Sequence, residues 1–358
     1  MLLPLFAALL GSVPPPPPVA VASDGVDTRG LIDFEAEGYS CEGTAVTPVR
    51  KAAILPIAMR PEVSLERDSQ VQTVGFAIDA QGRTISIRLP DGTYGDDIAP
   101  ALAATRFAAG TPRQACTARI VARYYPHDQI PRALAARYWT IPTRDRPRLE
   151  THALIAGPDG NCEKEPPRWL VRAQPDFDRV PVDPGALDFV AMTYSVDSAG
   201  RPRDIEARFT SGNAAFTQVG KRVMAQWRFQ PGEARAGCAY GYWSAPRSPL
   251  PPPPLDPGPM KKECPDLHFA YMPELGPYFP RAFSQRSIEG IALLRFSVAP
   301  WGQIGDVEVV ESQPAEAFGE AAMLLLPRAR LDRSDAPRVG CTATIRFSVP
   351  KRSRDTKG

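Results

Sequence analysis

Histidine is scarce in this chain of 358 residues, and the usual signatures of catalysis are missing. The only histidines are His127, His152 and His268, and no Cys-x-x-Cys spacing occurs, so the sequence offers no set of metal ligands. It also contains no G-x-S-x-G, no H-E-x-x-H and no phosphate-binding glycine loop. We therefore expect no catalytic residues, no cofactor and no metal, and we expect that the protein is not an enzyme.

An excess of charge of one sign is missing as well. Forty-two basic and 40 acidic residues leave a formal net charge of +2, whereas a nucleic-acid partner would require a strongly basic face. The basic stretch at 351–358 is interpreted as a solvated tail. A hydrophobic content of 43% with 23% charged residues is typical of globular protein, and the length indicates two or three domains.

The N-terminal apolar run is too short to span a membrane as an ordinary helix. Residues 2–13 would cover about 18 Å as a helix, against a hydrocarbon core of roughly 30 Å. Ala20-Val21-Ala22 offers a cleavage site before Ser23, so we interpret 1–22 as a signal-like segment. Because no basic residue precedes Arg29, three alternatives stay open: an atypical signal, a start site further upstream, and a buried N-terminal strand.

Six cysteines are present, and their spacing is regular. Taken in consecutive pairs, they are separated by 75, 76 and 77 residues. Six cysteines allow 15 connectivities in general, but the repetition selects one of them. We predict the disulfides Cys41–Cys116, Cys162–Cys238 and Cys264–Cys341. Disulfides of this kind persist in oxidising compartments, which agrees with export.

Three stretches of the chain share the same order of landmarks. Each has an alternating strand that ends in a glycine turn, then a helix end, then the second cysteine of a pair. The turns lie at 76–83, 194–201 and 296–303, with Gly82, Gly200 and Gly302 where a positive φ would close a hairpin. The turn glycine precedes the apolar residue at the helix end (Phe107, Phe229 or Leu331) by 25, 29 and 29 residues. This pattern predicts three tandem small α+β domains, each a three-stranded antiparallel sheet packed by helices.

The composition between these stretches sets the predicted boundaries. A degenerate first repeat covers 30–125, a proline-containing linker 126–150, and the second repeat 151–247. A proline-rich linker covers 248–259 and the third domain 260–350. We interpret the proline-rich linker as a semi-rigid spacer, with an SH3-like ligand as the alternative. The sequence leaves open whether the three domains pack together.

The third stretch resembles the TonB C-terminal domain, the periplasmic end of the energy transducer that serves outer-membrane receptors. The resemblance is carried by five motifs along residues 278–349: Tyr278-Phe279-Pro280-Arg281-Ala282, Glu289-Gly290, Phe296-Ser297-Val298 before Gly302, Val307-Glu308-Val309-Val310-Glu311-Ser312, and the Ala321-Ala322 helix with the closing strand. The second repeat shares the helix end Trp227-Arg228-Phe229-Gln230-Pro231, and the first repeat is only weakly similar.

The resemblance implies that a domain edge binds an extended peptide of a partner by strand pairing. By analogy, that edge is the last strand, with Thr342, Thr344, Arg346 and Ser348. It implies an exported envelope binding protein linked to TonB-dependent transmembrane transport, whose partner is an envelope protein or peptide. The chain differs from a transducer because its apolar segment is short and its domains number three. The alternatives are a scaffold associated with peptidoglycan or the membrane, and a transducer whose N-terminal anchor is truncated.

Overall fold

The computed structural model describes residues 30–59, 69–93, 95–142, 155–156, 160–162, 166–256, 264 and 267–349. Its architecture is mixed, with several small antiparallel sheets and few helices, which is compatible with the α+β class expected from the sequence. The signal-like segment at 1–22 and the basic tail at 351–358 lie outside the described residues.

The first sheet has six antiparallel strands. Their order is β2 (Thr44–Ala45), β1 (Gly30–Cys41), β6 (Arg113–Tyr125), β4 (Ser69–Ile78) and β5 (Thr84–Arg88), and β3 (Ile57–Met59) also pairs with β1. The prediction of three strands is wrong for this sheet because β1 was not recognised. A bulge between Ala36 and Gly38 moves the buried positions from Phe34 and Ala36 to Tyr39 and Cys41, which interrupts the apolar alternation in the sequence.

The second and third sheets have three antiparallel strands each. The second has the order β11 (Arg235–Ser244), β8 (Asp188–Val196) and β9 (Pro202–Thr210), and the third has β16 (Arg338–Phe347), β13 (Gly290–Val298) and β14 (Ile304–Gln313). Two short ribbons flank them, β7 (Trp169–Val171) with β10 (Arg228–Phe229) and β12 (Phe269–Tyr271) with β15 (Arg330–Leu331). In both sheets the strand that comes last in the chain is at an edge.

The glycine turns and the helix ends that recur in the sequence touch in space. Gly82, Gly200 and Gly302 have φ of +74°, +76° and +86°. Each glycine carbonyl accepts a hydrogen bond of 2.9–3.0 Å from the N–H of the helix-end residue, which is Phe107, Phe229 or Leu331. A Cβ on the glycine would lie 2.0–2.2 Å from that residue's carbonyl oxygen. A side chain would therefore clash with the backbone, which explains why the turn requires glycine.

Helices cover the faces of the sheets. On the second sheet, α4 (Ala214–Ala225) begins at Asn213, whose side chain accepts from the N–H of Phe216. Helix α6 (Glu316–Leu325) covers the third sheet, and α1 (Ile98–Ala104) packs against β5. Shorter helical segments complete the described part: α5 (Arg281–Gln285), η1 (His127–Gln129), η2 (Phe177–Arg179), η3 (Gly276–Tyr278) and η4 (Leu326–Arg328).

The predicted linker at 126–150 contains helix α2 (Arg132–Thr140), which joins two sheets. Leu134 and Tyr138 pack against Leu31 of β1, while Ala136 packs against Ala191 of β8 on the face opposite α4. Strand β8 is buried almost throughout because helices cover both of its faces. Over its described residues this stretch is therefore packed structure and not a free linker, which corrects the prediction.

The proline-rich stretch also lies against the fold. The N–H of Leu250 donates to the carbonyl of Ser287 (2.8 Å), and the N–H of Asp256 donates to the carboxylate of Glu311 (2.7 Å). Pro252 and Pro253 between them are buried. The described part of this predicted spacer therefore follows the third sheet from the start of β13 to β14.

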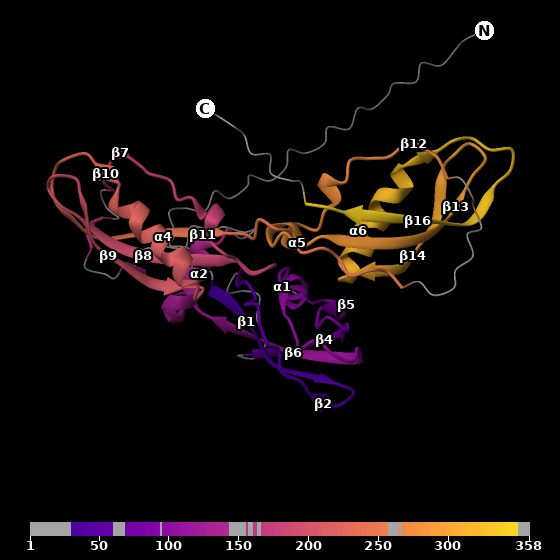
Figure 1. The fold of residues 1–358 in the computed structure, drawn as a ribbon, viewed down its shortest axis with the longest axis horizontal. Helices are drawn as coiled ribbons and strands as arrows, with labels where there is room; N and C mark the ends of the chain where they lie inside the picture. The colour runs from indigo at the N-terminus through magenta and orange to yellow at the C-terminus, as the bar shows by residue number, and fades with distance from the viewer. Residues whose placement is uncertain are drawn as a thin grey trace, which may run out of the picture.

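The three sheets meet at one junction, formed by Asp97, Gly185 and Arg286. Figure 1 shows the second and third sheets at the two ends of the molecule, with the first sheet below and between them. Arg286, from the segment after α5, is 1% exposed and pairs with Asp97 at the start of α1, with Nε 2.6 Å from the carboxylate. It also donates to the carbonyl of Gly185, just before β8, at 3.0 Å. One buried side chain thus connects all three sheets.

The hydrophobic cores follow the same arrangement. The first and third sheets share one continuous cluster, which runs from Phe34 and Leu102 to Phe296 and Phe318. The N–H of Ile87 in β5 donates to the carbonyl of Pro314 (2.9 Å) and so joins their edges. The second sheet has a separate cluster around Trp227 and Phe216. The first and third sheets therefore form one packed body, and the second sheet is joined to it.

Candidate functional site

The edge predicted to bind a partner lies on β16 of the third sheet. Thr342, Thr344 and Arg346 stand opposite Arg295, Leu293 and Ile291 of β13. Cys341, Ile345 and Phe347 alternate with them and are buried on the side of α6. Thr344 and Arg346 are exposed, Thr342 is half-buried, and Ser348 is exposed just beyond the end of the strand. The four predicted residues therefore form one solvent-facing row.

The outer edge of β16 is open in the part of the chain that the structure describes. Among these residues β16 pairs only with β13, and β11 of the second sheet pairs only with β8. An edge strand has backbone N–H and C=O groups along one side that no neighbouring strand satisfies. Such a row is what an added strand from another chain would use.

In the first sheet, the strand that carries the second cysteine of its pair has a neighbouring strand on each side. Strand β6, which carries Cys116, pairs on one side with β4 and on the other side with β1. Cys41 stands directly opposite Cys116, and the hydroxyls of Ser40 and Thr117 are 3.0 Å apart. The pairing is antiparallel and continues from Leu31 to Cys41. It shows that an edge of this kind accepts an extended segment.

The three disulfides lie at these edges. The structure joins Cys41 to Cys116, Cys162 to Cys238 and Cys264 to Cys341, the pairs expected from the cysteine spacing. The residue before the second cysteine has a positive φ in each case: Ala115 (+46°), Gly237 (+65°) and Gly340 (+69°). No described cysteine is free, so no thiol is left as a nucleophile among these residues.

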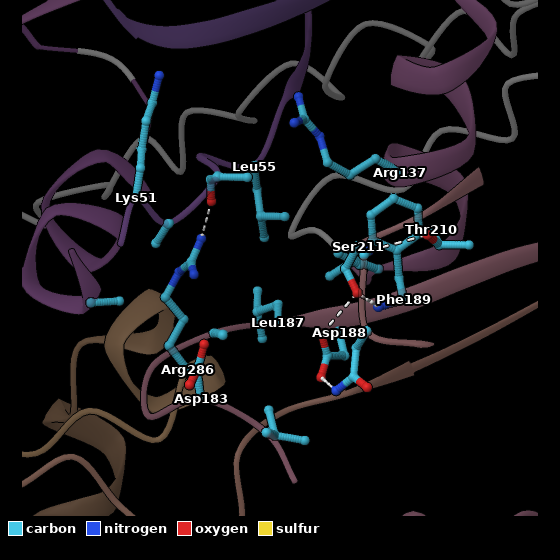
Figure 2. A pocket seen from close by; sticks show the side chains of 18 of the residues that line it. Lys51, Leu55, Arg137, Asp183, Leu187, Asp188, Phe189, Thr210, Ser211 and Arg286 are labelled. Atoms are coloured by element: carbon cyan, nitrogen blue, oxygen red, sulfur yellow. Dashed lines mark hydrogen bonds between the residues drawn. The ribbon is translucent and has the colours of Figure 1, made fainter. Parts of the chain in front are cut away.

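A cavity of about 900 Å³ lies beside the three-way junction, between α2, β8 and Arg286. Figure 2 shows Arg137, Asp183, Asp188 and Arg286 around it. Its charged groups are engaged within the protein. Arg137 pairs with Asp33, Arg50 pairs with Asp183 at 2.9 Å, and Asp188 accepts from Ser211 at 2.8 Å. Because its charged groups already have ion-pair or hydrogen-bond partners within the protein, we interpret this cavity as part of the joint between sheets.

The described residues contain neither a cluster of metal-binding side chains nor a membrane-spanning helix. No group of three or more His, Cys, Asp or Glu side chains in this part of the chain is placed to hold a metal ion. No helix within the described ranges is long and apolar enough to cross a membrane. Backbone N–H groups, chiefly that of Arg201, lower the pKa of Asp197, whose carboxylate closes the turn before Gly200. That residue has a structural role in the hairpin.

The sequence did not indicate two features of the structure. The first is the junction, because Arg286 and Asp97 are 189 residues apart and no local pattern connects them. The second is a groove along β11 that is lined largely by aromatic residues. The runs Tyr240-Gly241-Tyr242-Trp243 and Tyr138-Trp139 were the only available signal for the groove.

A comparison with protein families gives a match for one part of the chain. Residues 276–349 match the family described as Gram-negative bacterial TonB protein C-terminal. The match covers η3, α5, α6 and the third sheet, including the open edge of β16. Domains of this family belong to envelope proteins and interact with other proteins, and the three disulfides fit a location outside the cytoplasm. A comparison with curated proteins gives no match.

Proposed function

We propose that the protein is an exported binding protein of the cell envelope, in which β16 receives an extended segment of a partner protein. The pairing of β1 with β6 supports this proposal most directly, because it is the same kind of strand addition made within one chain. A further support is that the edge lies within residues 276–349, which match a family whose domains interact with other proteins. Main-chain hydrogen bonds would supply affinity, and the side chains of the exposed row would supply selectivity.

In this proposal, the three sheets are copies of one TonB-like domain that differ in how far their edge strand is covered. In the part of the chain that the structure describes, the first has its edge covered by β1, and the third has no strand beside the outer edge of β16. The second has its edge covered near Ala236, whose carbonyl accepts from the N–H groups of Asn161 and Cys162. All three keep the glycine turn and the disulfide. Such copies would supply docking edges on β16 and on the rest of β11 in one molecule, which would raise the effective affinity for a partner with two matching segments. We place the protein in the periplasm, with a role linked to TonB-dependent transport.

Site-specific photocrosslinking in the producing cells tests the proposal. A benzophenone amino acid replaces Thr342 or Thr344 on β16, and the matched control replaces Thr117, which follows Cys116 on β6 as Thr342 follows Cys341. Because β1 covers Thr117, only the β16 positions should crosslink to an extended segment of one partner, mapped by mass spectrometry. Equal crosslinking at Thr117, or crosslinks to peptidoglycan instead of protein, would contradict strand addition at β16.

A further inference from the structure

The ribbon of β7 and β10 exposes three apolar side chains in a row. Trp169, Leu170 and Val171, which make up the whole of β7, are 39%, 64% and 50% exposed. Among the described residues β7 pairs only with β10, and Figure 1 shows this ribbon on the side of the molecule that faces away from the first sheet. Neighbouring exposed apolar side chains of this size mark a surface that another molecule or a membrane covers.

The ribbon is anchored on the core of the second sheet, and one of its residues projects from it. The ring of Trp169 lies edge-on against the buried Trp227, with ring centres 4.3 Å apart, and its centre is 4.6 Å from that of Phe229. Leu170 is the extra residue of a bulge, because the residues on either side of it pair with successive residues of β10. The most exposed side chain of the ribbon is therefore also the one without a partner on the opposite strand.

Four arginines surround these apolar side chains. They are Arg168 and Arg172 at the two ends of β7, Arg228 on β10, and Arg201 after the turn glycine that pairs with β10. All four are exposed, and no carboxylate in the described part of the chain forms an ion pair with them. Arg172 donates to the hydroxyl of Tyr240 and Arg228 to the carbonyl of Trp227, which positions these guanidinium groups without neutralising them. The positive charge favours an anionic partner.

The equivalent ribbon of the third sheet lacks this combination. Strands β12 and β15 pair with the same bulge, but the bulged residue there is Ala270 instead of a leucine. His268 occupies the place of Arg168, and Asp332 that of Gln230, since the carbonyl of the first residue accepts from the N–H of the second in both ribbons. His268 lies 3.2 Å from the carboxylate of Asp332. The shared fold therefore requires neither the projecting leucine nor the unpaired positive charge of the second ribbon.

We propose that the β7–β10 ribbon binds the surface of a membrane that contains anionic lipids. Leu170 and the exposed part of Trp169 enter the boundary between headgroups and acyl chains, where tryptophan is favoured. The arginines bind lipid phosphates, which guanidinium groups hold with two parallel hydrogen bonds. This contact is separate from the partner edge on β16 and does not depend on it.

Two other occupants of the ribbon fit less well. A specific protein interface buries about 800 Å² on each partner, which is more than a ribbon of three and two residues offers. Membrane binding, in contrast, is the sum of small contributions from each inserted apolar side chain and each basic residue. A second copy of this chain would place its own arginines against these arginines, and like charges across an interface repel.

Sedimentation with lipid vesicles tests the proposal on the full chain and on the chain from Ser23, which lacks the apolar run at 2–13. Both should bind vesicles of phosphatidylglycerol and phosphatidylcholine, and high salt should weaken this binding. The partition coefficient of the chain from Ser23 should fall roughly fivefold in Arg168→Gln, and roughly tenfold or more in Leu170→Glu. The matched control is Ala270→Glu, which adds the same charge at the bulged residue of the other ribbon and should leave binding unchanged. Because all three positions are exposed, the melting temperature of each variant should stay the same.

Three results would overturn the assignment. The first is that the chain from Ser23 does not bind the anionic vesicles, or binds pure phosphatidylcholine vesicles equally well. The second is that Arg168→Gln and Leu170→Glu bind as well as the unsubstituted protein, or that Ala270→Glu loses as much affinity as Leu170→Glu. The third is that a benzophenone amino acid at position 170 crosslinks in cells to one protein and not to lipid, which would make the ribbon a protein-binding site.

Discussion

Arg286 is a residue on which three parts of the chain depend. Its guanidinium is buried, pairs with Asp97 and bonds the carbonyls of Gly185 and Ala53. The carboxylate of Asp97 also accepts from the N–H of Leu55 at 2.7 Å. Removal of one partner from a buried ion pair leaves an uncompensated charge, which is far more harmful than the absence of both.

We expect Arg286→Ala to lower the free energy of unfolding by about 3–5 kcal/mol, measured by urea denaturation. The control is Arg281→Ala, five positions earlier and exposed, with an expected change within about 0.5 kcal/mol. The double variant Arg286→Met/Asp97→Asn should be more stable than Arg286→Ala, because no lone buried charge remains. Equal losses in the Arg286 and Arg281 variants would show that the junction contributes no special stability.

The raised pKa of Tyr39 leads to a prediction of how the stability changes at high pH. Burial, opposed in part by a hydrogen bond with Thr105, raises its pKa from 10.0 to about 12. Between pH 10 and 12 the unfolded chain loses this proton before the folded chain does. The free energy of unfolding that protonated Tyr39 contributes below pH 10 therefore declines across that range. In Tyr39→Phe the decline should be less steep, as followed by thermal melts. The exposed Tyr271 provides the control, and Tyr271→Phe should leave the decline as steep as in the unsubstituted protein.

At the scale of elements, β1 is the strand that most distinguishes the first sheet from the three-stranded second and third sheets. It lies along β6, and ion pairs of Glu35 and Glu37 with Arg119 and Arg123 lie on the solvent side. Exposed pairs of this kind contribute little. Burial of Phe34 and Ala36, the ladder of hydrogen bonds and the Cys41–Cys116 disulfide are therefore the main attachments of β1.

We expect Cys41→Ser/Cys116→Ser to lower the free energy of unfolding by up to about 4.5 kcal/mol, the value for a loop of this length in the chain-entropy model. The measurement is urea denaturation of both proteins under oxidising conditions. A second readout is sedimentation, since a strand that detaches from β6 exposes an edge that favours self-association. A variant with unchanged stability that remains monomeric would show that packing alone holds β1.

The sequence predicted those elements whose signals are local or covalent. The glycine turns were recognisable because a positive φ favours glycine, and the disulfides because the cysteine spacing repeats. Strand β1 was missed because the bulge near Gly38 interrupts its alternation, and α2 because prolines around it suggested a linker. Arg286 and the groove at Tyr242 depend on contacts between distant segments, which no local pattern reveals. The alternation that defines the row on β16 is also local, and the role of that row as a binding edge remains a proposal.

At the scale of the whole molecule, the first and third sheets share one core, so we expect them to unfold as one cooperative body. Phe296→Ala, in that core, should lower the amide protection of both β16 and β6, with a cost of about 3–5 kcal/mol. Met224→Ala, in the separate core of the second sheet, should lower protection in β8 and β11 only. Hydrogen exchange with mass spectrometry measures both. Unchanged protection of β6 in the Phe296 variant would contradict a shared body.

The pairing of the cysteines also has a consequence for biogenesis. The cysteines are bonded in consecutive pairs along the chain, first with second, third with fourth and fifth with sixth, so no bridge overlaps another. A chain that emerges N-terminus first into an oxidising compartment would bring Cys116 to a waiting Cys41, then Cys238 to Cys162, then Cys341 to Cys264. At about 5–20 residues per second, each first cysteine waits on the order of 4–15 s for its partner. Oxidation in order of emergence therefore gives the native connectivity directly, and no later reshuffling of disulfides is required.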